Sequence, residues 1–231
     1  MIDVGSTEGR VVAAALRLAG EKPWQDVTLR QIAEAAGLNL AELSEHFASK
    51  SEILAAFVRL VDKQVLASAP APQEGESKRD ALFEVVMARF DAMTPYKAAL
   101  GSIAGSGEVE FALIRPVLCS QGWMLQAAGI DSDGPAGAVR KAGLASAYAS
   151  VFRTWLDDDD PGMARTMAVL DRRLRSGETV MSGLDSALGA ARRLKDILRS
   201  GGGSRRQEQG KDVPGEPVDG TAGRAGPHTA I

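Results

Sequence analysis

The sequence has few cysteines, histidines and aromatic residues and little net charge, and these shortages exclude several classes of protein. Its 231 residues include one cysteine, Cys119, which excludes an intramolecular disulfide and a cysteine-built metal site. Cys119 lies in an apolar run, so we expect it to be a small buried residue. Strand-like alternation of apolar and polar residues is absent, which predicts an all-α fold. The formal net charge of −3 gives no sign of a polyanionic partner.

Long apolar stretches and catalytic motifs are also missing. No uninterrupted apolar stretch approaches ~20 residues, and the N-terminus lacks a basic region followed by an apolar one. We therefore expect no membrane span and a cytoplasmic location. His46 and His228 are the two histidines, and no nucleophile elbow, phosphate loop, paired carboxylates or metal spacing stands out. We expect a protein that is not an enzyme and has no catalytic residue, no cofactor and no metal.

Residues 28–47 contain the most informative pattern in the chain. Thr28 stands three residues before Gln31, and Asn39 stands three before Glu42, which is the spacing of a capping box at a helix start. Between the two expected helices, Gly37 fits a left-handed turn position. Two short helices joined by such a turn are the plan of a helix-turn-helix.

Helical periodicity and linker composition divide the remaining chain. We expect helices near residues 7–20 and 49–67, a Pro- and Gly-containing linker, and further helices near 80–93, 108–128, 136–156, 163–177 and 182–198. Pro116 should kink or split the helix near 108–128. Four consecutive aspartates, residues 157–160, favour a solvated turn in which Asp160 caps the next helix. The predicted units are residues 1–66, a linker at 67–77, a second α-helical domain at 78–199, and a disordered tail at 200–231.

Residues 10–61 resemble the N-terminal domain of the TetR family of bacterial transcriptional regulators. The resemblance is carried by the Ala-rich first helix, by VTLRQIAEAAGL at 27–38, and by HFASKSEIL at 46–54. It implies three helices that form a DNA-reading unit and a fourth that connects them to an α-helical ligand-binding and dimerisation domain. A homodimer, double-stranded DNA and a small apolar or lipid-like ligand are the implied partners.

The resemblance places the expected DNA contacts in and around the second helix of the motif. The candidates are Thr28, Arg30, Asn39, Leu40, Glu42, Ser44, His46 and Lys50. Between Asn39 and Phe47 there are two acids, Glu42 and Glu45, and no Lys or Arg. Since Lys and Arg supply much of the affinity for phosphates, this helix lacks the usual basic footprint of a DNA reader.

Met and aromatic residues in the second unit are candidates for an apolar pocket. The predicted lining is Phe83, Met87, Phe90, Phe111, Arg115, Trp123, Met124, Tyr148 and Trp155. Each aromatic could instead be plain core, and Arg115 could meet an anionic ligand head or simply reach solvent. The sequence therefore predicts a pocket without naming its ligand.

A second resemblance leads to an alternative function. The motifs WLD at 155–157, Pro161, ARTMA at 164–168 and LDRRL at 170–174 are similar to the lipid-binding accessory protein of coenzyme Q (ubiquinone) biosynthesis, which shares the TetR fold. Residues 82–100 resemble it less specifically. The first interpretation is a ligand-responsive, TetR-type repressor, and the capped motif favours it. The alternative is a lipid or isoprenoid carrier that has lost DNA binding, and the acidic reading helix favours that one.

Overall fold

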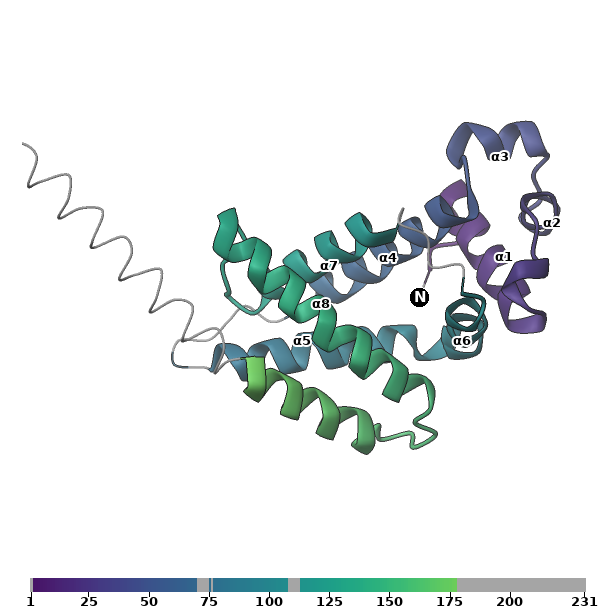
Figure 1. Ribbon diagram of the computed structural model, residues 1–231. Coiled ribbons are helices and arrows are strands. Elements are labelled where there is room, and N and C mark those ends of the chain that lie inside the picture. The colour runs from purple at the N-terminus through teal and green to yellow at the C-terminus, as the bar shows by residue number, and fades with distance from the viewer. Residues whose placement is uncertain (1, 70–74, 76, 108–112, 178–231) are drawn as a thin grey trace, which may run out of the picture. The chain divides into compact units, whose positions relative to one another are not determined.

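The computed structural model describes residues 2–69, 75, 77–107 and 113–177. Every regular element in these residues is helical. The elements are α1 (Thr7–Glu21), η1 (Trp24–Asp26), α2 (Leu29–Ala35), α3 (Leu40–His46), α4 (Lys50–Ser68), α5 (Lys78–Met93), η2 (Thr94–Tyr96), α6 (Lys97–Gly105), α7 (Ile114–Ala127) and α8 (Gly134–Leu156) (Figure 1). Residues 164–177 are also helical. The predicted all-α class is therefore confirmed.

Side-chain caps start the helices of the N-terminal part. The Ser6 hydroxyl accepts a hydrogen bond from the Gly9 N–H at 3.0 Å, so α1 begins one residue later. At the start of α4, the Ser49 hydroxyl accepts from the Glu52 N–H at 3.2 Å. The Glu52 carboxylate reaches back to the Ala48 N–H at 2.8 Å. These caps satisfy backbone donors that a helix cannot pair internally, and they fix where each helix starts.

The apolar faces of α1 to α4 form the N-terminal core. Val11, Ile32, Leu43 and Ile53, one from each helix, are almost completely buried. The helix α1 packs on α2, α4 and α6, and α4 also packs on α5 and α7. Helices from both sides of the predicted linker therefore pack together within the compact unit that residues 1–185 form.

Two prolines lie where a helix starts. Pro95 lies in η2, directly before α6, as its missing N–H allows. Pro116 lies in the first turn of α7, where the backbone N–H needs no partner. The predicted kink or split of a helix over residues 108–128 remains a prediction, because the part before α7 is not fully described. Residues 108–112, and the helix expected near 182–198, lie outside the described residues.

In the loop that joins α8 to residues 164–177, the predicted cap at Asp160 is confirmed, but the four aspartates are not all solvated because Asp158 is buried. Asp160 accepts hydrogen bonds from the Gly162 and Ala164 N–H groups, both at 3.1 Å, and so caps the following helix. Asp158 accepts from the Thr166 N–H at 2.8 Å and from the Thr166 hydroxyl at 2.6 Å. These hydrogen bonds lower the pKa of the Asp158 carboxyl below its usual value.

One face of α7 is more exposed than its composition indicates. Cys119 is exposed, so the prediction of a buried thiol is wrong. Trp123, four residues later on the same face, is 56% exposed. On the other side of α7, Met124 and Leu125 are buried in the core. A helix that is apolar on most sides does not reveal from sequence which side its neighbours cover, and this is why the prediction failed.

Candidate functional site

The helix-turn-helix consists of α2, α3 and the turn between them, and local hydrogen bonds fix its shape. The Gln31 N–H donates to the Thr28 hydroxyl at 3.3 Å, and the Thr28 N–H donates to the Gln31 side-chain oxygen at 3.1 Å. In α3 the Glu42 N–H donates to the Asn39 side chain at 3.0 Å, and the Asn39 N–H donates to the Glu42 carboxylate at 2.8 Å. Both predicted capping boxes are confirmed.

Gly37 turns the chain between the two helices. Its φ is 72°, in the left-handed region that favours glycine. The Gly37 N–H donates to the Glu34 carbonyl at 3.1 Å, and the Leu38 N–H donates to the Ala33 carbonyl at 2.9 Å. These bonds pair the last carbonyls of α2 as the chain leaves the helix. The turn therefore sets how α3 is presented relative to α2.

The outward face of α3 carries few groups that could contact a ligand. Leu40 is 39% exposed, and Glu42, Ser44, Glu45 and His46 are exposed as well. The Glu42 carboxylate is turned back onto the start of its own helix, and the Ser44 hydroxyl donates to the Ala41 carbonyl at 2.7 Å. Leu40, Glu45 and His46 are exposed and have no side-chain hydrogen bond or ion pair with another described residue.

The other predicted DNA contacts differ in how accessible they are. Thr28, Arg30 and Asn39 are exposed. Lys50 is only partly exposed, because its ammonium donates to the Trp24 carbonyl at 3.1 Å and lies 4.8 Å from the centre of the Trp24 ring. A cation over an indole face is held by the charge distribution of the ring. Lys50 therefore links α4 to the segment before α2, a contact that sequence reasoning did not anticipate.

A hydrogen-bonded link also connects the N-terminal helices with α6. The Ser102 hydroxyl accepts from the Trp24 N–H at 3.1 Å and donates to the Lys22 carbonyl at 3.3 Å. A hollow of about 380 Å³ lies beside this link, between the end of α1, η1 and α6. Trp24 is thus held from two sides, by Ser102 and by Lys50.

A buried polar cluster joins α4, α5, α7 and α8. The Arg89 guanidinium forms an ion pair with Asp62 and donates from Nε to the Tyr148 hydroxyl at 3.1 Å. The Ser120 hydroxyl donates to the same Asp62 oxygen at 2.8 Å. Burial alone would lower the pKa of Arg89, but Tyr148 and Asp62 hold it above its ordinary value. Burial also raises the pKa of Tyr148, so the arginine stays charged and the phenol stays neutral.

Aromatic side chains surround this cluster instead of lining an open cavity. The Phe90 ring stacks on Tyr148 with centroids 5.1 Å apart, and it lies 5.5 Å from Trp155. Phe90, Met124 and Trp155 are buried in the core. Of the other predicted pocket residues, Arg115 and Trp123 are exposed, and Phe111 lies outside the described residues.

A separate groove brings two of the predicted pocket residues together. Phe83 is half-buried and Met87 is buried, and both line a groove of about 510 Å³ with the ends of α4 and α7 and with residues 161–167. We call it the α5 groove. Its lining consists of Val65, Ser68, Ala69, Ala81, Phe83, Glu84, Val85, Met87, Ala88, Asp91, Ala127, Pro161, Gly162, Met163 and Met167. Its volume is in the range of small-molecule sites.

Neither a metal centre nor a membrane-spanning element is found in the described part of the chain. No group of three or more His, Cys, Asp or Glu side chains there could hold a metal ion. No helix there is long and apolar enough to cross a membrane.

Comparison with known proteins supports the helix-turn-helix directly. Residues 11–57 match the family model described as "Bacterial regulatory proteins, tetR family". This segment contains α2, the turn, α3, most of α1 and the first part of α4. The predicted resemblance of the N-terminal domain to TetR-family regulators is confirmed. No curated protein matches the chain.

Solved structures extend the similarity beyond this domain. A TetR transcriptional regulator from Nitrosomonas europaea ATCC 19718 has a TM-score of 0.58 at 21% identity, covering 74% of this chain and 97% of its own. One from Rhodococcus sp. RHA1 has a TM-score of 0.54 at 21% identity, with 73% and 93% covered. A third, from Streptomyces coelicolor, has a TM-score of 0.53 at 16% identity, with 84% and 88% covered. These likenesses confirm the TetR-like fold, and none of them supports the resemblance to the coenzyme Q accessory family.

Proposed function

We propose that this chain, whose N-terminal domain is of the TetR type, is a ligand-responsive transcriptional regulator that binds double-stranded DNA as a homodimer. The observation that carries the proposal is the doubly capped helix-turn-helix, with its left-handed turn at Gly37, inside the segment that matches the family model. In such a motif the second helix enters the major groove. Here that helix is α3.

The contacts of α3 reduce the electrostatic objection to DNA binding. Glu42 uses its carboxylate to cap α3, where the positive end of the helix dipole stabilises it. It therefore points toward its own helix start and not outward. Leu40 offers an apolar contact for a thymine methyl group, and His46 offers a hydrogen-bonding ring to base edges. Glu45 is the acid of α3 that has no such structural partner among the described residues.

The small number of exposed cations around the motif sets the expected character of binding. Arg30 is exposed, whereas Lys50 is held against Trp24. Since each neutralised phosphate contributes about 0.9 to the slope of log K against log salt, few phosphate contacts give a shallow salt dependence. We expect modest affinity that rests on base contacts and on the two-fold repetition of the site.

Two connections would carry a ligand signal to α2 and α3. The helix α4 follows α3 and ends at the α5 groove, where Val65, Ser68 and Ala69 belong to the lining. The helix α6 is tied to η1 through Ser102. A ligand that binds one arrangement of these helices better than another would shift the separation of the two reading helices in the dimer.

A selection from a random duplex library tests this proposal. The purified full chain is expected to enrich a two-fold symmetric sequence at low salt, with half-sites about one helical turn apart. The α3 variant L40A/H46A should lose the enrichment, because it removes two outward side chains without touching a buried one. The matched control is Arg172→Gln, an exposed position in residues 164–177. If the wild-type chain enriches no sequence at low salt, the proposal is overturned.

A further inference from the structure

The α5 groove has acidic side chains in its lining. Glu84 and Asp91 belong to it, and among the described residues that line the groove there is no Lys, Arg or His. The two acids are seven residues apart on α5, which is about two helical turns, so they lie on one face roughly 10 Å apart. The charge of the lining is therefore negative along the length of the groove.

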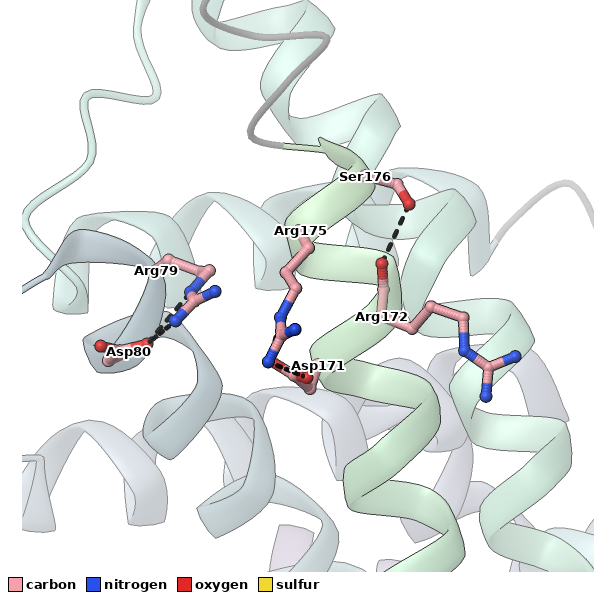
Figure 2. A network of polar contacts seen from close by, with 6 residues as sticks. All are labelled: Arg79, Asp80, Asp171, Arg172, Arg175 and Ser176. Atoms are coloured by element: carbon pink, nitrogen blue, oxygen red, sulfur yellow. Dashed lines mark hydrogen bonds and ion pairs between the residues drawn. The ribbon is translucent and has the colours of Figure 1, made fainter.

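These two acids differ from the other acids of the same region. Asp80 pairs with Arg79 at 2.7 Å, and Asp171 pairs with Arg175 at 2.8 Å; both pairs are drawn in Figure 2. Glu84 and Asp91 form no hydrogen bond or ion pair with any described residue, and both are exposed. Asp80 and Asp171 are thus each paired with an arginine, whereas Glu84 and Asp91 are not.

The remaining lining is apolar and adaptable. Phe83, Met87, Met163 and Met167 supply one aromatic ring and three thioethers. Methionine side chains are flexible and polarisable, so they adjust to ligands of different shape. An aromatic face and thioether sulfurs also suit a positively charged partner. Met167 is 36% exposed, which is high for an apolar side chain and leaves surface for a ligand to cover.

The groove wall is held in place by its own loop. Met163 has a φ of 51°, a left-handed conformation that costs a non-glycine residue free energy. It is maintained because Asp160 binds the backbone on both sides of it, and because the Met163 N–H donates to the Asp160 carbonyl at 2.9 Å. A strained residue held by its surroundings at the edge of a groove is typical of a ligand site.

We propose that the α5 groove binds small organic cations with an apolar body. The apolar part would pack against Phe83 and the methionines, and the positive charge would face Glu84 or Asp91. The groove also includes the end of α4, so we assign this class of ligand to the effector role, an assignment that rests on the proposed function above. Binding itself does not depend on that function.

Two ions of nearly the same shape and opposite charge test the proposal. Tetraphenylphosphonium and tetraphenylborate present similar apolar surfaces, so a difference in their affinity reports the charge of the site. We expect the full-length protein to bind the cation about tenfold more tightly in calorimetric titrations at low salt, since attraction to two carboxylates replaces repulsion. The variant E84Q/D91N keeps the shape of both side chains and should lose this preference.

Matched variants locate the effect in the groove. Asp171→Asn removes an acid that is already paired with Arg175, and it should leave the preference unchanged. Ala88→Trp fills the groove and should weaken binding of both ions, with circular dichroism used to verify folding. Equal affinity for the two ions, no binding of the cation, or full preference in E84Q/D91N would each overturn the proposal. Because the titration contains no DNA, its failure is distinguishable from a failure of DNA binding.

Discussion

The buried ion pair between Arg89 and Asp62 gives the sharpest prediction about stability. The two side chains are 4% and 9% exposed, so water screens them little. Replacing Arg89 by Met removes the charge that compensates Asp62 and leaves a carboxylate buried with only the Ser120 hydroxyl as donor. Removing one partner of a buried pair costs about 3–5 kcal/mol. For a folded unit of this size, that corresponds to a drop in melting temperature of roughly 6–20 °C.

Urea unfolding followed by circular dichroism, at one fixed protein concentration, measures the loss. The control is Arg17→Met, which breaks an exposed pair with Glu21 and should cost less than about 1 kcal/mol. The double variant D62L/R89M removes both charges and should recover most of the stability, because an apolar pair of similar size replaces a buried ion pair at little cost. An R89M protein as stable as R17M would refute the reasoning.

Three further predictions concern the turn, the acidic loop and the thiol. Gly37→Ala should destabilise the protein by about 1–2 kcal/mol in urea unfolding. The new methyl group has open space, since nothing lies within 4 Å of it, but the left-handed φ strains any residue with a side chain. A stabilised variant would contradict this. The pKa of Asp158 is lower in the folded protein than its ordinary value of 3.8. The ionised carboxylate therefore stabilises the fold above pH 3.8, and this stabilisation is lost as the pH falls through the folded pKa. Asp158→Asn should therefore lose less stability on acidification than the wild type, and an identical acid profile would argue against it. Cys119 is exposed and should react with a thiol reagent in the native state at a rate close to that of the unfolded chain; protection until unfolding would show that this face of α7 is covered.

The helix-turn-helix could be predicted from sequence because its determinants are local. Each capping box places its partners three residues apart, and the left-handed turn needs only a glycine after α2. The cap at Ser49 has the same spacing, and Asp160 binds N–H groups two and four residues later. Interactions of this range depend little on how the rest of the chain folds, so sequence reasoning located them.

Features that depend on packing between distant helices could not be predicted. Asp62 and Arg89 are 27 residues apart and meet only because α4 packs on α5. In the sequence alone, nothing distinguishes Asp62 from an acid on the surface of α4. The exposure of Cys119 and Trp123 depends on which side of α7 its neighbours cover.

In the candidate binding surfaces, too, local features could be predicted and features that depend on packing could not. The residue types for an apolar site were recognised in Phe83 and Met87, but the groove that holds them also requires residues 161–167 and the end of α4. The aromatic residues Phe90 and Trp155 have the same composition signal and are core. Lys50 is one of the predicted DNA contacts, yet its position over Trp24 follows only from the folded arrangement of α4 and η1.

The central claim is that α3 reads DNA, and a fluorescence anisotropy titration of a duplex obtained by selection tests it most directly. The titration is repeated across a series of salt concentrations with the wild type and the L40A/H46A variant. We predict saturable binding of two chains per duplex at low salt, a shallow loss of affinity as salt rises, and weaker binding by the variant. If the wild type does not bind at the lowest salt, or if the variant binds equally well, α3 does not read DNA.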